Sequence, residues 1–528
     1  MKDDQQVHHR CRRWLCAALS LFILAAGGCR PDVTKKSAQD QGLFSRTPLP
    51  GAYLTDEAGE ANIIQPGRHW MGSVDARAGL TFANWRNTDG TNRFCIVVRS
   101  DPEGDRLVLM PLDDGETSLS VLTDPVRRKY YEQRLAAIRV EMTDGVLSER
   151  LIYTSLAEAV AGKRLGPPLP PPRQVLAVAA NFPSHLKEDL AIDDPTVLEA
   201  LRGTRPRVFM KYPPVFPMSG MTPAEEVVGI IGPFDPIRYP STIQVPARDE
   251  NEQLVRVDTR VDYEAEIGIV IGRRLTWQEI AQASDRDLYD AVVGYLLISD
   301  TKARNPQVVQ AIVGRDRPIP EDPGPYLTGN EKIDRQLGFW DKETCRWWSY
   351  AAGWGDFAGL GPFLVAAPHS RTLPDRMMLT GRSYAPEAIR GQPIPPGHKT
   401  DTFYLRQAVI VSTREGYADR MLWTVPQIIR STLAPDNALD FRPHPLTLYP
   451  GDIISLGTPG GTVITVKPKV VVDVADALLF WWEPLDWHDA FFGGTEAMYL
   501  NPGDEVFFWA EDLGYQRHSM EAFDPKGP

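Results

Sequence analysis

The chain has 528 residues, 43% of them hydrophobic and 13 of them Trp, which is enough for two or three globular domains. Its formal net charge of -12 excludes the basic surface of a nucleic-acid-binding protein, so we expect no nucleic-acid partner. Its five cysteines contain no C-x-x-C pair, which argues against a cysteine-based zinc site and against a disulfide-built scaffold.

The N-terminus has the three zones of an export signal. Three arginines within residues 10–13 precede an apolar run over 14–26, and small residues then lead to Cys29. This order predicts a signal peptide with a lipobox over residues 1–29, a lipid on Cys29 and a polar tether over 30–50. The alternatives are an ordinary secretory signal cut nearby and, because of Arg12-Arg13, a twin-arginine route. We expect a protein of the cell envelope, lipid-anchored to the membrane on the periplasmic side of a bacterial membrane or at the cell surface.

Residues 51–165 are predicted to form a small β-rich N-terminal domain. Two apolar segments, 80–85 and 94–98, flank a turn-rich stretch and predict a hairpin. Residues 126–161 carry apolar side chains among charged ones and predict a helix. The proline-rich segment 165–172 predicts a stiff boundary before the next domain.

Two later segments place three carboxylates on predicted strands. Over residues 262–271, apolar residues alternate with Glu264 and Glu266, so both glutamates point from one face. An apolar run from 292 to 298 predicts a buried strand that ends at Asp300. Like charges on an apolar strand are costly unless a cation neutralises them, and hard oxygen ligands favour Mg²⁺, Mn²⁺ or Ca²⁺ over zinc. The alternative is a buried carboxylate set paired with Arg304.

A third segment holds His185 and Glu188, which are three residues apart and so share one face of a helical turn. A carboxylate beside an imidazole can raise its basicity and fix its tautomer, as a base that activates water requires. On spacing alone, a surface histidine with a chance acidic neighbour is the better interpretation.

Four motifs, taken in order, resemble those of the fumarylacetoacetate hydrolase family. They are residues 181–188 (NFPSHLKE), the E-x-E strand at 264–266, the D-x-x-A-R-x-x-Q segment at 300–307 and the L-G-T-P-G-G segment at 456–461. The resemblance covers residues 174–515. It implies a mainly β fold with short helices (α+β), in which a mixed β-sandwich roll follows the small N-terminal domain. It also implies a homodimer.

The resemblance assigns roles to individual residues. The ligands of a divalent metal, Mg²⁺ or Mn²⁺ with Ca²⁺ as an alternative, would be Glu264, Glu266 and Asp300. The catalytic pair that activates water would be His185 and Glu188. Contacts to substrate oxygens would come from Arg304, Gln307 and Thr458, where the alternatives are a structural arginine and a bare turn.

The chain departs from the family at three places. Ala352 stands where the family has a lysine that stabilises negative charge beside the metal, so Lys302 and Lys342 are candidate substitutes. Insertions at about 308–350 and 464–500 are predicted as surface decoration, a dimer contact or a substrate lid.

The prediction for function is a metal-dependent hydrolase that cleaves a C–C bond in a small 2-oxo or diketo acid, such as an acylpyruvate or a compound like fumarylacetoacetate. The alternatives are a decarboxylase, hydratase or isomerase of the same family, and a non-catalytic lipoprotein that binds a metal and an oxo acid. A lysine or arginine close to the metal ligands would favour the enzyme.

Overall fold

A computed structural model of the chain describes residues 63–64, 79–101, 106–144, 150–190, 192–212, 229–246, 254–305, 326–337, 348–367, 376–383, 403–411, 420–434, 447–460, 462, 499–510 and 512–524. The predicted signal peptide and tether, much of the 308–350 insertion and nearly all of the 464–500 insertion lie outside these residues. In the described part of the chain, no helix combines the length and the hydropathy needed to cross a bilayer.

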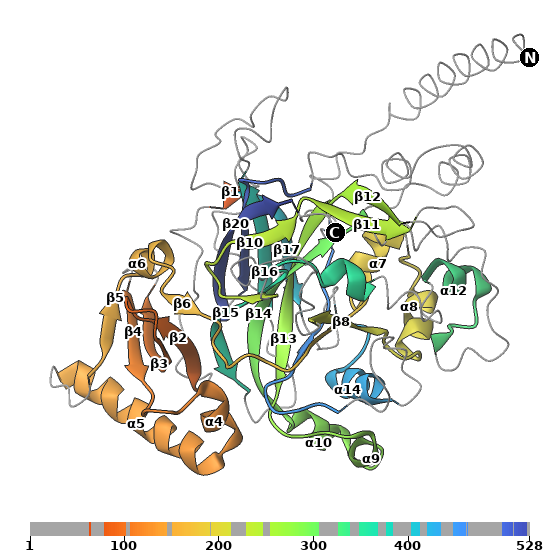
Figure 1. The fold of residues 1–528 in the computed structure, drawn as a ribbon. Coiled ribbons are helices and arrows are strands. Elements are labelled where there is room, and N and C mark those ends of the chain that lie inside the picture. The colour runs from red at the N-terminus through yellow and green to blue at the C-terminus, as the bar shows by residue number, and fades with distance from the viewer. Residues whose placement is uncertain are drawn as a thin grey trace, which may run out of the picture. The chain divides into compact units, whose positions relative to one another are not determined.

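A large mixed sheet of twelve strands dominates the fold (Figure 1). Its main path runs β5-β4-β3-β2-β15-β14-β13-β18-β7-β8, and β6 and β9 pair with β2 and β15. Most neighbours are antiparallel, whereas β7 with β18 and β9 with β15 are parallel. The strands are β2 Thr81–Arg86, β3 Asn92–Asp101, β4 Arg106–Pro111, β5 Ile152–Thr154, β6 Leu165–Gly166, β7 Val175–Val178, β8 Val208–Tyr212, β9 Ile230–Ile231, β13 Val261–Ile271, β14 Val292–Ala303, β15 Ala358–Ala366 and β18 Ile453–Ser455.

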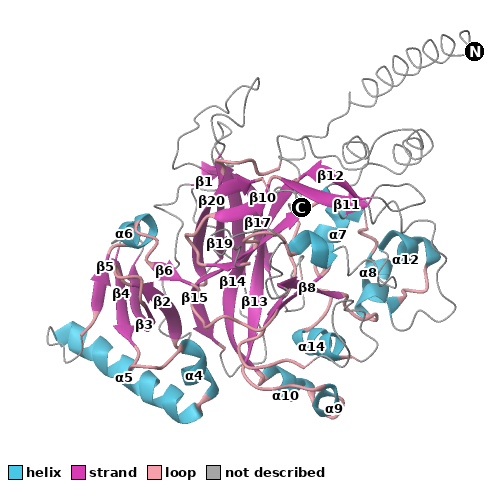
Figure 2. Cartoon of the chain, viewed as in Figure 1, coloured by secondary structure: helices cyan, strands magenta, loops and turns pink. Residues whose placement is uncertain are grey.

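A second sheet packs against the first and has the order β1-β17-β16-β19-β20-β10 (Figure 2). The buried Gln516 of β20 joins the two sheets, since its Nε2 donates to the carbonyls of Leu297 at 3.0 Å and Gly361 at 2.8 Å. The strands are β1 Ile63–Ile64, β10 Ile237–Pro240, β16 Arg376–Ser383, β17 Phe403–Val411, β19 Glu505–Ala510 and β20 Gly514–Phe523, and a separate pair is formed by β11 Thr242–Pro246 and β12 Leu254–Asp258. The predicted mainly β, α+β class is therefore confirmed.

The predicted hairpin is confirmed by β2 and β3, which pair with Phe82 opposite Ile96. The single predicted helix over 126–161 is wrong in its second half. Helix α5 (Pro125–Asp144) follows α4 (Ser118–Thr123) and ends well before 161. The chain then forms β5, which pairs with β4, and a new helix, α6 (Leu156–Ala161). A capping box between Ser155 and Glu158 starts that helix.

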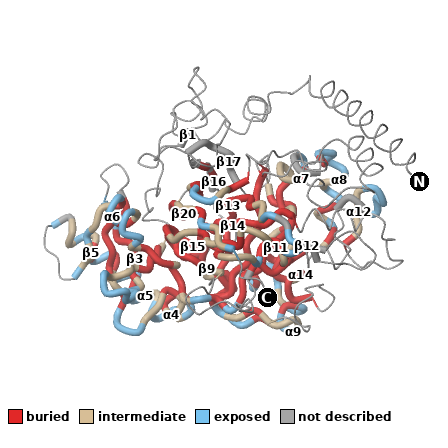
Figure 3. The backbone as a smooth tube through the Cα atoms, turned by 45° about the horizontal axis from the view of Figure 1, so that its top comes forward, coloured by how far each residue is buried: buried red, intermediate tan, exposed pale blue. Residues whose placement is uncertain are grey.

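The strands of the N-terminal region continue the large sheet, because β2 pairs with β15 through Phe82 and Leu364. One hydrophobic cluster accordingly contains residues from both sides of the proline-rich segment, such as Phe82, Leu296 and Leu364. Figure 3 shows the buried core that runs through these strands. The limits proposed for the N-terminal and catalytic domains remain a prediction.

The remaining helices are short and lie near one end of the sheet order or in its connections. They are α7 Pro183–Leu190, α8 Pro195–Arg202, α9 Trp277–Ile280, α10 Asp285–Tyr289, α12 Glu331–Leu337 and α14 Val425–Leu433. Each of α8, α9, α10 and α14 begins at an Asp, Ser or Thr whose side chain accepts a hydrogen bond from a first-turn amide.

The large sheet curls. Four strand spacings separate β14 from β8 in its order, which on a flat sheet is roughly 19 Å. The Nζ of Lys211 on β8 nevertheless lies 3.3 Å from the carbonyl oxygen of Thr301 on β14. The curl therefore turns the Lys211 side chain onto β14 near its C-terminal end, beside Asp300 and Thr301.

Candidate metal centre

The centre is built on the antiparallel pair of β13 and β14. Glu264 lies directly opposite Asp300 in the register, and Glu266 is two residues further along the same strand face. All three carboxylates are buried. Strand β14 continues three residues past Asp300, so the predicted strand end at Asp300 is wrong. Its position inside the strand is what fixes Asp300 against Glu264.

The three carboxylates can each offer one oxygen such that all three oxygens lie within 4.8 Å of one another. Oxygens bound to one Mg²⁺, Mn²⁺ or Ca²⁺ at about 2.0–2.6 Å can be at most about 5 Å apart. The cluster therefore fits a divalent metal site. It contains neither Cys nor His among its members, which suits a hard cation and not zinc.

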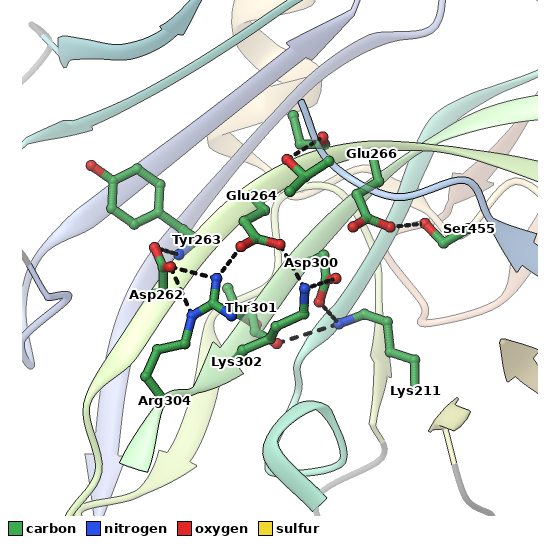
Figure 4. Close-up of polar contacts among 12 residues, drawn as sticks. Lys211, Asp262, Tyr263, Glu264, Glu266, Asp300, Thr301, Lys302, Arg304 and Ser455 are labelled. Atoms are coloured by element: carbon green, nitrogen blue, oxygen red, sulfur yellow. Dashed lines mark hydrogen bonds and ion pairs between the residues drawn. The ribbon is translucent and has the colours of Figure 1, made fainter. Parts of the chain in front are cut away.

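Three cationic side chains surround these carboxylates (Figure 4). The Nζ of Lys302 lies 2.6 Å from Glu264 Oε2 and 2.9 Å from Asp300 Oδ2. Lys211 donates to the other Asp300 oxygen, Oδ1, and Arg304 donates to the other Glu264 oxygen, Oε1. Arg304 also binds Asp262 Oδ2 through Nε at 2.8 Å and Nη2 at 2.7 Å. Both oxygens of Glu264 and of Asp300 are thus held by cations.

These contacts divide the carboxylates into two kinds. Burial alone raises the pKa of Glu264, but Arg304 and Lys302 outweigh it and bring the pKa below its ordinary value. Burial likewise opposes ionisation of Asp300, yet Lys211 and Lys302 hold its pKa well below the ordinary value. For Glu266, burial raises the pKa well above the ordinary value, and neighbouring Asp300 raises it further. Glu266 is therefore the member that most needs an added cation in order to ionise.

The cations also differ. Burial lowers the pKa of Lys211, and this outweighs its attraction to Asp300. Burial acts in the same direction on Lys302, but Asp300 and Glu264 together raise the pKa of Lys302 above its ordinary value. Lys302 is thus firmly charged in this pocket.

The end of β18 and the loop after it lie against β13 and the start of α7. Ser455 Oγ donates to Glu266 Oε2, and the Leu456 amide donates to the carbonyl of Ile267 at 2.9 Å. Asn181 Nδ2 donates to the Leu456 carbonyl at 2.7 Å, and the Gly460 amide donates to Ser184 Oγ at 2.7 Å. The four sequence motifs, which are spread over more than half of the chain, therefore converge on one site.

His185 is on α7, close enough to the cluster for its charges to act on the imidazole. Burial lowers the pKa of His185 to about 4, with Lys302 and Arg304 acting in the same direction and Glu264 and Asp300 opposing them. The imidazole is consequently neutral at pH 7 and able to accept a proton. Glu188 lies one turn further along α7, and its side chain is outside the described residues. The catalytic pair remains a prediction.

The predicted substrate contacts have mixed outcomes in geometry. Arg304 is committed to Asp262 and Glu264, which matches the alternative of an arginine that pairs with buried carboxylates. Thr458 is buried, and its Oγ1 lies 3.3 Å from the carbonyl of Ala265 between Glu264 and Glu266. Gln307 lies outside the described residues, as does the candidate Lys342. Their roles remain predictions.

The sequence interpretation missed Lys211. Its signal was a lone lysine inside the apolar strand segment Val208–Tyr212, because a buried charge at such a position requires a partner. Lys302, one of the two candidates for the absent lysine, does lie on the carboxylates. Ala352 itself is buried in the hydrophobic core.

Comparison with known proteins gives a family match over the part of the chain that holds this centre. The sequence profile described as the fumarylacetoacetate (FAA) hydrolase C-terminal domain matches residues 174–319 and 324–521. Among curated proteins, none matches the chain significantly.

Solved structures similar to the chain carry the names of hydrolases and of isomerases. A fumarylacetoacetate hydrolase from psychrophilic Exiguobacterium antarcticum is 18% identical, with 84% of this chain and 100% of that chain covered and a TM-score of 0.42. A maleylpyruvate hydrolase from Sphingobium sp. SYK-6 is 15% identical, with 84% and 100% covered and a TM-score of 0.40. A probable 2-hydroxyhepta-2,4-diene-1,7-dioate isomerase from Mycobacterium abscessus is 18% identical, with 85% and 100% covered and a TM-score of 0.40.

The profile match extends over more than half of the chain and includes the carboxylate cluster, the helix of His185 and the loop of Thr458. The chain belongs to the fumarylacetoacetate hydrolase family.

Proposed function

We propose that the protein is a metal-dependent hydrolase that cleaves a C–C bond in a small 2-oxo or diketo acid. The observation that carries this proposal is the buried cluster of Glu264, Glu266 and Asp300, whose oxygens fit one divalent cation, inside the region that matches the family. A divalent cation bound there supplies a Lewis acid for a chelated oxygen pair of the substrate.

The residues around the cluster support an enzyme more than a passive binding site. Stabilising the negative charge that develops when a C–C bond breaks requires a positive group that is already in place. The family lysine is absent at Ala352, but Lys211 and Lys302 both contact Asp300. Our proposal is that one of them supplies this charge. Lys211 is the better candidate, since it contacts Asp300 through Oδ1 and can keep that oxygen while Oδ2 binds a metal.

Water activation is assigned to His185. Its neutral imidazole can take a proton from water at pH 7, whereas a pKa of about 4 makes it a weak base on its own. Glu188 would correct this weakness from the next turn of α7, because a carboxylate beside the ring favours the protonated imidazole. Burial therefore accounts for the neutral resting state of His185, and Glu188 would supply the added basicity that hydrolysis requires.

The second candidate function is isomerisation, decarboxylation or hydration of the same class of acid. It draws support from the isomerase named among the similar structures and from the absence of lysine at Ala352. The third candidate is a non-catalytic protein that binds a metal and an oxo acid. The three differ in products and therefore in what one assay detects.

The test is a panel of acylpyruvates and related 2-oxo and diketo acids, incubated with the protein and Mg²⁺ or Mn²⁺. Loss of the diketone absorbance together with release of a carboxylic acid and a shorter 2-oxo acid is expected, and EDTA should abolish both. Release of CO₂, or an absorbance change with no cleavage product, would support the second candidate. Metal and oxo-acid binding by calorimetry without any product would replace the enzyme with the binding protein.

Export and lipid attachment at Cys29 are a further part of this proposal, and they rest on the order of the N-terminal zones. We expect the native mature protein to start at a diacylated or triacylated Cys29 and to fractionate with membranes. Intact-mass spectrometry of the native protein and of a Cys29→Ala variant measures this. An unmodified native chain that starts at Met1 would contradict it, and a soluble chain cut near Cys29 would indicate an ordinary secretory signal.

A further inference from the structure

Lys302 occupies a particular place in the candidate metal centre. Asp300 and Lys302 are two residues apart on β14 and so share a face, and Lys302 stands opposite Asp262 in the register. Its side chain runs back along that face, so that Nζ lies 2.6 Å from Glu264 Oε2 and 2.9 Å from Asp300 Oδ2 (Figure 4). The ammonium thus bridges two of the three carboxylates that would hold a metal.

The other two cations hold different oxygens. Arg304 is bonded to Glu264 Oε1, and Lys211 to Asp300 Oδ1. Lys302 therefore takes the one oxygen that remains on each of these two carboxylates. A divalent ion chelated between Glu264 and Asp300 has to compete with Lys302 for those oxygens.

The net charge of the pocket also favours replacement of Lys302 by a divalent ion. With every group ionised, Asp262, Glu264, Glu266 and Asp300 carry four negative charges against three positive charges on Lys211, Lys302 and Arg304. A divalent ion added to this set leaves a buried excess of positive charge, whereas the same ion in place of Lys302 leaves none. Uncompensated buried charge is costly, so a metal bound to the carboxylates and the Lys302 ammonium destabilise each other.

Lys302 can leave the carboxylates without unfolding the strand. Lysine carries its charge on a flexible four-carbon stem, and the ring of Phe209 presents a face 5.7 Å from the ammonium. The Lys302 side chain is 9% exposed, whereas the side chains of Lys211, Glu264 and Asp300 are fully buried. It is the member of the cluster that is nearest to solvent.

We propose that Lys302 is a tethered cation that holds the metal-free pocket together and is displaced when a divalent metal binds. This inference deepens the proposed function, since it concerns regulation of the same site. It raises the free metal concentration needed to fill the site, because metal binding has to break the two Lys302 ion pairs. It also keeps the pocket folded before the metal arrives.

The test compares wild type with Lys302→Met, which keeps the length and the packing of the stem and removes the charge. Lys129→Met, a change at an exposed lysine on α5, is the matched control. Mn²⁺ affinity is measured by isothermal titration calorimetry, and thermal unfolding is followed in EDTA and in Mn²⁺. We expect Lys302→Met to bind Mn²⁺ roughly tenfold more tightly than wild type. In EDTA it should melt a few degrees lower than wild type, and Mn²⁺ should restore it.

The possible outcomes distinguish failure of the Lys302 proposal from failure of the proposed metal-dependent function. If wild type binds Mn²⁺ and Lys302→Met binds it no more tightly, then Lys302 is not a competitor, and the proposed function stands. If Lys302→Met unfolds in EDTA at the same temperature as wild type, Lys302 does not stabilise the metal-free pocket. If neither protein binds Mn²⁺, Mg²⁺ or Ca²⁺, the ammonium is the permanent cation of the site, and both the tethered-cation proposal and the metal-dependent function are wrong. A Lys302→Arg variant that keeps the apo stability of wild type would show that charge, and not stem packing, is responsible.

Discussion

Replacement of Asp300 by Asn is expected to destabilise the protein by about 3–5 kcal/mol at neutral pH, the usual cost of removing one partner from a buried ion pair. Asp300 Oδ1 accepts from Lys211 and Asp300 Oδ2 pairs with Lys302 at 2.9 Å. Lys302 would retain Glu264, but Lys211 would retain only uncharged acceptors, the Thr301 carbonyl at 3.3 Å and the new amide oxygen. A fully buried ammonium would thus lose its counterion. Denaturant unfolding in EDTA measures the change in free energy.

The pH dependence of that effect has a fixed sign. The pKa of Asp300 lies below its ordinary value of 3.8, so its contribution to stability is complete above that value and is lost as the pH falls through the lower, folded-state pKa. The gap between wild type and Asp300→Asn should therefore be full at neutral pH and shrink in acid. A constant gap, or none, would contradict an ionised Asp300 that is paired with two lysines.

Glu266→Gln supplies the matched comparison within the same cluster. Burial raises the pKa of Glu266 well above its ordinary value, so ionised Glu266 lowers the stability of the fold without metal. The amide of Gln removes that charge and its oxygen can still accept from Ser455 Oγ, the partner of Glu266 Oε2. We expect stability in EDTA equal to or above that of wild type. Mn²⁺ affinity should nevertheless fall by roughly 100-fold or more, beyond the loss typical of outer-shell changes.

The parts of the site that could be predicted from sequence are those set by local periodicity. Alternation over β13 places Glu264 and Glu266 on one face, because side chains of a strand alternate whatever it pairs with. The spacing of His185 and Glu188 likewise predicts one face of α7. The break between α5 and α6 was also readable, since Ser155 and Glu158 form a capping box signature that the helical interpretation passed over.

The remainder depends on pairings between distant segments. The register that sets Asp300 opposite Glu264 is fixed by the whole β13–β14 pair, including three residues beyond the predicted strand end. Lys211 reaches Asp300 only because the sheet curls through four strand spacings, a property of the complete sheet. The planar guanidinium of Arg304 suits a substrate carboxylate, but it pairs with two buried carboxylates of β13, Asp262 and Glu264. The candidate ligands could thus be predicted from local patterns, whereas the counterions of these ligands depend on the tertiary structure.

Replacement of His185 by Asn is expected to lower kcat/KM about 10²–10⁴-fold, the usual contribution of a general base, on whichever oxo acid the panel identifies. Asn keeps a polar group of similar size on α7 and cannot accept the proton of an attacking water. His185 is not among the three carboxylates that fit a metal, so Mn²⁺ affinity and thermal stability should stay close to those of wild type. Steady-state kinetics together with calorimetry measure both. A parallel loss of metal affinity and activity would make His185 a structural neighbour of the site and not its base.

Glu188→Gln distinguishes the pair from a histidine that acts alone. The pKa of His185 near 4 describes a weak base, and a carboxylate partner is the expected source of greater basicity. Glu188→Gln should therefore lower kcat far more than it weakens metal binding, because the pair acts after the substrate is bound. In wild type, the acidic limb of kcat/KM should lie below 6.5, the ordinary pKa of imidazole, since burial and the two nearby cations favour the neutral ring. An acidic limb above that value in both wild type and Glu188→Gln would place the essential base elsewhere, and Glu188→Gln with unchanged kcat would leave His185 without its predicted partner.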